Sequence, residues 1–223
     1  EANRARDEAI PRARKELPQL APHAAEAALA AFPKQQKHHL AIDATIQRRL
    51  EDLARKKIAT LGPRVSLAIL VADNETGEVL ARVGSVDFND AERAGRIDMT
   101  RGVRSPGSAL KPFIYGLAFE DGVAHPETLI EDRPTRFGAW RPENFDLTYH
   151  GTVSLRRALQ LSLNVPAVAL LESVGPQRLF ARLEQSGAQL QLPQGEVPGL
   201  AIGLGGLGLR LEDLAALVLR QRP

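Results

Sequence analysis

The chain has 223 residues, of which 43% are hydrophobic and 25% are charged, which is ordinary for a globular domain that can bury a substantial core. A net charge of +2 and an aromatic content of 4% argue against a nucleic-acid partner, because they indicate neither a basic surface nor a platform for stacking bases. The absence of cysteine excludes disulfides and thiol chemistry.

Residues 1–39 are rich in Ala, Arg, Glu and Pro, and they show no long periodic apolar stripe. A short helix is predicted over residues 24–32, and the prolines around it favour a linker that packs loosely on a domain formed by residues 40–223. The cluster Lys34, Lys37, His38 and His39 is compatible with a metal or phosphate site. A solvated connector is favoured, because no acidic or cysteine partner lies at ligand spacing. No metal site and no cofactor site is therefore predicted.

Asp43 is a good N-cap for a helix that runs to about Leu61 and that Gly62 and Pro63 would end. The buried face of this helix is predicted from its apolar stripe: Ile46, Leu50, Leu53, Ala54, Ile58 and Leu61. Two strands are predicted over residues 65–72 and 79–83, joined as a hairpin by the turn at 73–78. The first strand is apolar at nearly every residue, which predicts that both of its faces are covered. Strands packed against helices indicate an α/β or α+β fold and not a helical bundle.

Residues 88–101 are polar and are predicted to form a loop that leads to a turn at Pro106-Gly107. An amphipathic pattern begins directly after this turn, and its apolar stripe consists of Leu110, Phe113, Ile114, Leu117 and Ala118. Ser108 therefore lies at the N-terminus of a helix, where the first backbone N–H groups have no partner within the helix. Lys111 follows three residues later, so it lies beside Ser108 on nearly the same face.

This pair has a chemical use. A serine hydroxyl is a weak nucleophile unless an adjacent base takes its proton, and lysine can be that base when desolvation lowers its pKa. Apolar neighbours predict partial burial of Lys111, which is the only one of six lysines after Lys57. Arginine could not replace it, because arginine does not lose its proton in proteins. From the pattern alone, the alternative is a serine helix cap followed by a surface lysine.

The connection over residues 122–152 contains three prolines and little periodicity, and we expect it to wall a cleft. Trp140 is predicted to be its packing anchor, with stacking on a substrate as the alternative. Ser154 is predicted to cap a helix that runs to about Leu161, Pro166 to begin a helix that ends near Gly175, and residues 176–185 to form another. Ser162 and Asn164 fall on the turn between the first two of these helices. Their polar side chains either point into a cleft or cap the helix ends.

Residues 203–208 match the pattern G-x-G-x-x-G, and a helix is predicted directly after them, over 211–219. No clear strand precedes the glycines, and an acidic residue about 20 positions further on would lie beyond the chain, so dinucleotide binding is disfavoured. We expect these glycines to let the following helix enter beneath the sheet.

The order of the motifs suggests a family. Ser108 and Lys111, at the spacing S-x-x-K, resemble the first motif of the penicillin-binding proteins and serine β-lactamases, and Ser162-Leu163-Asn164 resembles the second. Leucine in the middle of the second motif favours the penicillin-binding proteins. Further matches lie at residues 42–47, 76–81, 142–146 and 149–151. Together they resemble the transpeptidase region of a bifunctional class A penicillin-binding protein of the C-type subgroup.

The resemblance implies an antiparallel sheet flanked by helices and a serine D,D-transpeptidase acylated by D-Ala-D-Ala stem peptides of peptidoglycan, and by β-lactams. It assigns Ser108 as the nucleophile, Lys111 as its base and Ser162 as the proton relay to the leaving amine. It assigns Asn164 to hold a substrate amide. It also implies a periplasmic location, with an upstream glycosyltransferase domain and a membrane anchor, neither of which this sequence contains.

The third motif of the family, K-T-G, does not occur in the 223 residues. By resemblance, it would supply the second oxyanion N–H and the groups that hold the substrate carboxylate. We therefore expect a transpeptidase domain that is truncated before this motif. The alternatives are a D,D-carboxypeptidase or β-lactamase-type hydrolase, and a non-catalytic module that binds cell wall or a partner.

Overall fold

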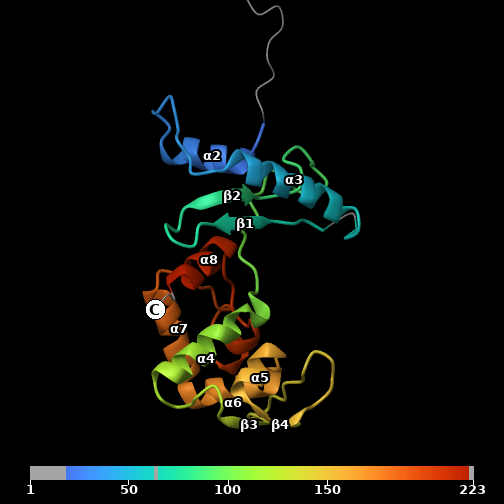
Figure 1. Cartoon of the computed structure of the whole chain (residues 1–223), viewed down its shortest axis with the longest axis vertical. Helices are drawn as coiled ribbons and strands as arrows, with labels where there is room; N and C mark the ends of the chain where they lie inside the picture. The colour runs from blue at the N-terminus through green and yellow to red at the C-terminus, as the bar shows by residue number, and fades with distance from the viewer. Residues whose placement is uncertain (1–18, 63–64, 221–223) are drawn as a thin grey trace, which may run out of the picture.

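A computed structural model describes residues 19–62 and 65–220. Figure 1 shows two lobes, with helix α8 between them. In the hairpin lobe (residues 19–62 and 65–101) two helices lie over a β-hairpin: α2 (Pro22–Ala31), α3 (Ala44–Ile58), β1 (Ile69–Ala72) and β2 (Val79–Val83). Within the described ranges, no helix combines the length and the apolarity needed to cross a membrane.

The helical lobe (residues 105–205) contains four helices, two 3₁₀ turns and a second two-stranded sheet. In chain order these are η1 (Gly107–Leu110), α4 (Lys111–Glu120), β3 (Leu129–Asp132), β4 (Gly151–Ser154), α5 (Leu155–Gln160), α6 (Asn164–Val174), α7 (Pro176–Gln185) and η2 (Leu200–Leu204). Helix α8 (Leu211–Arg220) follows and contacts β1 of the hairpin lobe. The mixed α/β class with antiparallel pairing agrees with the sequence prediction.

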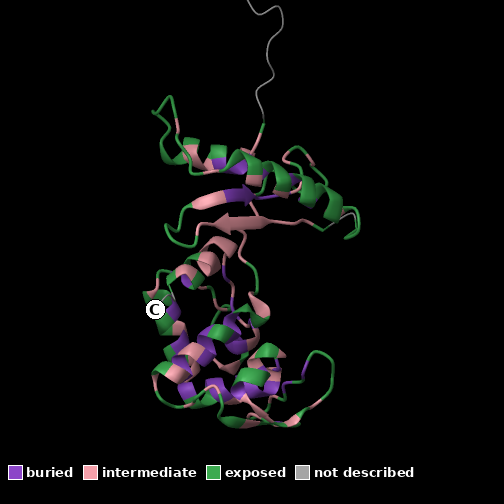
Figure 2. Ribbon diagram, in the orientation of Figure 1, coloured by how far each residue is buried: buried purple, intermediate pink, exposed green. Residues whose placement is uncertain are grey.

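The predicted hairpin is present, with Ile69 opposite Val83 in the antiparallel pair. Its turn is held by Asp73, whose N–H donates to the carbonyl of Glu78 (2.7 Å) and whose carboxylate accepts the N–H of Thr76 (2.7 Å). β1 is shorter than predicted, and all four of its residues are only partly buried (Figure 2), so the prediction that both of its faces are covered is wrong.

The buried face of α3 also differs from its apolar stripe. Asp43 caps the helix as predicted, accepting the N–H groups of Thr45 and Ile46, but the buried residues are Gln47, Glu51 and Ala54, while Leu53 and Leu61 are exposed. The reason is a polar contact with β2. The side-chain amide of Gln47 accepts the N–H of Arg82 (2.8 Å) and donates to its carbonyl (2.9 Å), so it occupies the place of a neighbouring strand. The helix ends at Ile58, and Pro63, one of its predicted terminators, lies outside the described residues.

The helix predicted over 24–32 is present as α2, but it does not pack loosely. His23 is buried and hydrogen-bonds through its Nε2 to the carbonyl of Gly95 (2.8 Å). The N–H of Ala21 donates to the carboxylate of Glu51 (2.9 Å). Residues 1–18 of the predicted linker lie outside the described residues, and the boundary between linker and domain at residues 39 and 40 stays a prediction.

The main core lies in the helical lobe, where α4 packs against α6 and α6 packs against η2. The predicted stripe of α4 is buried in full, and so are Lys111 and Tyr115. The helices predicted to begin after Ser154, near Pro166, at Pro176 and at Leu211 are present as α5, α6, α7 and α8. The pair β3–β4 was not predicted, because each strand has four residues and 18 residues separate them.

We expect Gln47→Leu to destabilise the fold. The leucine fills a similar volume but leaves the N–H and the carbonyl of Arg82 without their partner, and such buried groups cost about 1–3 kcal/mol each. The free energy of unfolding, measured by urea denaturation, should fall by at least about 2 kcal/mol. Arg48→Ala, at an exposed position of the same helix, is the control. A loss of less than about 0.5 kcal/mol in Gln47→Leu, the scale of an ordinary surface substitution, would contradict the account.

Candidate active site

Ser108 is exposed and lies in the 3₁₀ turn that leads into α4. The turn needs Gly107, whose φ of 53° is in the left-handed region. It rests on the glycine run at residues 203–208. Ser105 Oγ donates to the carbonyl of Gly205 (2.7 Å), and a Cβ at Gly205 would collide with Ser105 and Gly107. Gly205 therefore admits the turn that carries Ser108. The helix that follows the glycines, α8, packs against β1 of the hairpin, as expected.

Lys111 begins α4 and is 1% exposed. Its Nζ donates three hydrogen bonds, to the carbonyl of Ser162 (2.5 Å), to Ser162 Oγ (3.1 Å) and to Asn164 Oδ1 (2.6 Å). Burial lowers the pKa of the Lys111 amine to about 8. The alternative of a surface lysine after a helix cap is therefore wrong for this residue.

Ser162 connects α5 to α6, and its φ of 53° is unusual for a residue other than glycine. The left-handed conformation costs about 1–2 kcal/mol. It directs both the carbonyl and the hydroxyl of Ser162 toward the same amine, Lys111 Nζ. This strained turn thus brings two acceptors to Lys111 from a position 51 residues further along the chain.

Asn164 is the first residue of α6, and both ends of its side-chain amide are engaged. Its Oδ1 accepts from Lys111, while its Nδ2 donates to the carbonyl of Glu143 (2.7 Å). The structure therefore brings three of the four predicted site residues, Lys111, Ser162 and Asn164, into one hydrogen-bonded group. That Asn164 holds a substrate amide stays a prediction.

Ser108 and Lys111 share no hydrogen bond, although both lie within the described part of the chain. All three hydrogens of a protonated amine are donated to the acceptors above, which indicates that the charged form of Lys111 occupies this arrangement. A neutral amine keeps two donors and gains a lone pair that can accept the proton of a serine. That Lys111 activates Ser108 stays a prediction.

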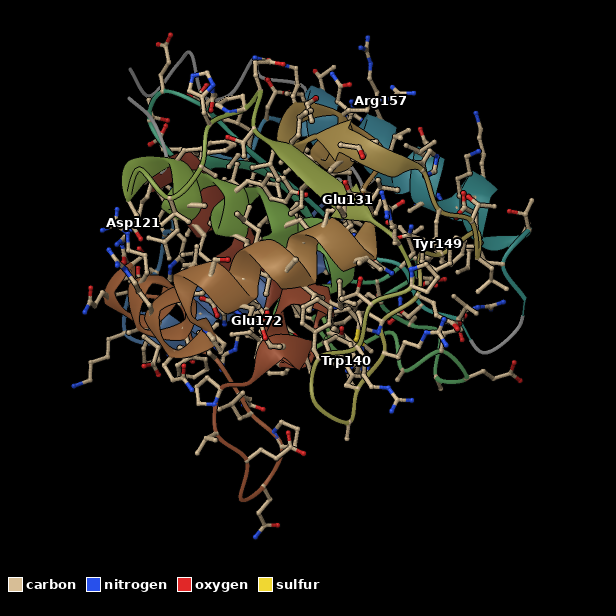
Figure 3. All side chains as sticks on the ribbon, turned by 90° about the horizontal axis from the view of Figure 1, so that it is seen from below. Asp121, Glu131, Trp140, Tyr149, Arg157 and Glu172 are labelled. Carbon is tan, nitrogen blue, oxygen red and sulfur yellow. The ribbon has the colours of Figure 1, made fainter. Side chains whose placement is uncertain are left out.

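The connection between β3 and β4 is anchored by polar residues that sequence reasoning did not single out. Asp132 and Asn144 are buried, while Trp140, the predicted packing anchor, is only partly buried. Figure 3 shows Trp140 and Tyr149 on this connection, at the end of α6 away from Glu172. The available signal was two family-like stretches. Residues 142–146 contain Asn144, and residues 149–151 contain His150, whose N–H donates to Asp132 (2.8 Å).

Comparison with known proteins identifies the family. A family model described as the penicillin-binding protein transpeptidase domain matches residues 67–197, which is more than half of the chain. The chain belongs to this family. Penicillin-binding protein 1C of Escherichia coli (strain K12) is 48% identical over 211 residues, which cover 95% of this chain and 27% of that protein. Penicillin-binding protein 1A of Vibrio cholerae is 38% identical over 154 residues, which cover 65% of this chain and 18% of that protein.

These relatives agree with the class A family and the C-type subgroup expected from the motifs. The chain spans about a quarter of the length of the E. coli relative and less than a fifth of the V. cholerae relative. Among solved structures, penicillin-binding protein PonA1 from Mycobacterium tuberculosis matches with a TM-score of 0.73 at 21% identity, covering 88% of this chain and 55% of that one. A structure of PonA1 in complex with penicillin V matches with a TM-score of 0.65. These two likenesses support the fold.

The lowered pKa of Lys111 predicts a pH-dependent stability. The amine binds its proton less tightly in the folded chain, with a pKa of about 8, than at the ordinary value of 10.5. Between these two values the unfolded chain holds more of this proton, so raising the pH favours the folded state. We expect the free energy of unfolding of the wild type, relative to Lys111→Met, to rise between about pH 8 and pH 10.5.

The comparison uses denaturant titrations at several pH values. Lys57→Met, which removes an exposed lysine of α3, serves as the control. Taking the difference between variants cancels the titration of other groups, including Tyr115, whose pKa is raised by burial and by the charge of Asp132. Equal slopes in the wild type and Lys111→Met would mean that burial does not perturb this amine.

Proposed function

We propose that this chain supplies the acylation site of a serine D,D-transpeptidase that cross-links peptidoglycan through D-Ala-D-Ala stem peptides. The observation that carries the proposal is the buried amine of Lys111, three residues after the exposed hydroxyl of Ser108. Membership of the penicillin-binding protein transpeptidase family supports the substrate class. β-Lactams would acylate the same serine.

Acylation begins when Ser108 Oγ attacks the carbonyl carbon of the penultimate D-Ala and neutral Lys111 takes the hydroxyl proton. The backbone N–H of Ser108 donates to the developing oxyanion. The C–N bond to the terminal D-Ala then breaks. Lys111 gives a proton to Ser162 Oγ, 3.1 Å away, and the Ser162 hydroxyl gives its own proton to the leaving amine.

Cross-linking returns the serine to its starting form. The amine of a second stem peptide attacks the ester carbonyl, the ester C–O bond breaks, and the amine proton passes through Lys111 to Ser108 Oγ. In a β-lactam the leaving nitrogen stays attached to the acyl group after the ring opens. The leaving group then cannot diffuse away, which favours a long-lived acyl-enzyme.

The pKa of the base decides how much of the enzyme is ready to react. With a pKa of about 8, about a tenth of Lys111 is neutral at pH 7. An unperturbed lysine, with a pKa of 10.5, would be neutral in fewer than about one molecule in a thousand at that pH. Burial therefore raises the fraction of active base by more than about a hundredfold.

The longer protein to which this chain corresponds would act outside the cytoplasm, since peptidoglycan stem peptides are its substrate. We propose a periplasmic location, with a membrane anchor and a glycosyltransferase domain upstream, on the strength of the class A relatives. The proposed location, the anchor and the upstream domain are inferred from family membership and from the greater length of the relatives.

Ser108→Ala should abolish covalent labelling of the chain by a fluorescent penicillin. The fold should survive, because Ser108 is exposed and caps neither η1 nor α4, and such surface substitutions usually change stability by less than about 0.5 kcal/mol. Labelling is read on a denaturing gel after long incubation, and folding is checked by circular dichroism. Ser173→Ala, at an exposed position of α6, is the matched control and should label like the wild type. Undiminished labelling of Ser108→Ala would overturn the choice of nucleophile.

Lys111→Arg should keep the positive charge but lose the base. Positioned general bases contribute about 10²–10⁴-fold, so we expect acylation to slow by at least about 100-fold. The measurement is the second-order rate of penicillin labelling followed by mass spectrometry. A rate within a few-fold of the wild type would show that residue 111 acts only through its charge.

A further inference from the structure

We propose that Asn144 is a positioning residue, which fixes Asn164 and through it the amine of Lys111 by tying the start of α6 to the buried carboxylate of Asp132. Only one part of this inference rests on the proposed function, namely that the Lys111 amine acts as a base. Asn144 is 3% exposed and lies in the connection between β3 and β4, 20 residues before Asn164.

One end of the Asn144 amide holds the beginning of α6. Its Oδ1 accepts the N–H of Asn164 (2.7 Å) and lies 3.5 Å from the N–H of Val165. The residue before the helix, Leu163, offers no side-chain cap. Asn144 thus supplies, from a distant segment, the acceptor that the first N–H groups of a helix require.

The other end of the amide is held by an anion. Nδ2 of Asn144 donates to both carboxylate oxygens of Asp132, at 2.8 and 3.0 Å, and to the carbonyl of Thr148 at 2.8 Å. Asp132 is fully buried and also accepts the N–H of His150 (2.8 Å), with His150 Nδ1 at 3.2 Å. A buried carboxylate accepts but cannot donate, so Nδ2 must face Asp132 and Oδ1 must face α6.

The neighbouring residue then sets the orientation of the Asn164 side chain. The carbonyl of Glu143 accepts from Asn164 Nδ2 at 2.7 Å, which leaves Asn164 Oδ1 directed at Lys111 Nζ, 2.6 Å away. Residues 143 and 144 therefore hold both the backbone and the side chain of Asn164. Among the described residues no ion pair reaches Lys111, so these neutral acceptors are what holds its charge.

A residue that merely anchored the loop would leave the titration of Lys111 unchanged, and this distinguishes the two roles. The chain contains six lysines, so the side-chain resonances of isotopically labelled lysine are few, and Lys111→Arg assigns the one in question. The wild-type resonance should titrate near pH 8. In Asn144→Ala the N–H of Asn164 loses its acceptor and the start of α6 loses its tie to Asp132. Asn164 Oδ1 is then held less firmly against the ammonium, so the midpoint should fall by about half a pH unit or more.

The matched control is Asp146→Ala, in the same loop, where an exposed carboxylate accepts from the N–H and hydroxyl of Thr148. It should leave the midpoint of Lys111 in place. An unchanged midpoint in Asn144→Ala, or an equal shift in Asp146→Ala, would overturn the proposal.

A second variant covers the case in which Asn144→Ala does not fold. Asn144→Ser keeps a hydroxyl that can donate to Asp132 and removes the Oδ1 that accepts the N–H of Asn164. It should fold, and the midpoint of Lys111 should fall as in Asn144→Ala. A wild-type midpoint in folded Asn144→Ser would count against the proposal. Penicillin labelling of the wild type tests the proposed function separately, since the titration of Lys111 needs no activity.

Discussion

The arrangement of the site depends on one buried amine. An ammonium group removed from water must be compensated by hydrogen bonds, because an uncompensated buried charge is strongly destabilising. Lys111 finds its three acceptors on Ser162 and Asn164, which places α4 and the α5–α6 turn at hydrogen-bonding distance from each other. The packing of α4 on α6 and this polar contact therefore support each other, and the same burial that costs stability gives the lysine a pKa suited to a base.

Two left-handed backbone conformations serve this site, and only one of them is unfavourable. Ser162 adopts a φ of 53°, which is strained for a residue other than glycine, and its carbonyl and hydroxyl thereby reach Lys111. Gly107 adopts the same φ without steric cost in the turn that exposes Ser108, and Gly205 leaves space for that turn. Strain such as that at Ser162 persists where surrounding contacts over-determine it, and it is commonly found at functional sites.

Local sequence patterns predicted the features that depend only on residues close together in the chain. The stripe of α4 and the caps at Asp43 and Ser154 each need only a few neighbouring residues, and all are present in the structure. Gln47, Asp132 and Asn144 escaped prediction because their partners are distant in sequence and because buried polar residues leave no trace in an apolar pattern. Local reasoning placed Ser162 and Asn164 on a turn between helices, but only the family resemblance assigned them to the same site as Lys111, since nothing in their local spacing points to that residue.

A crystal structure of the chain after reaction with a penicillin would test the central claim most directly, namely that a buried lysine held by the α5–α6 turn activates Ser108. The account predicts a covalent bond from Ser108 Oγ to the carbonyl carbon of the opened β-lactam. It also predicts that Lys111 Nζ remains within hydrogen-bonding distance of Ser162 Oγ and Asn164 Oδ1. An adduct on any other residue, or a Lys111 side chain turned away from that turn, would contradict it.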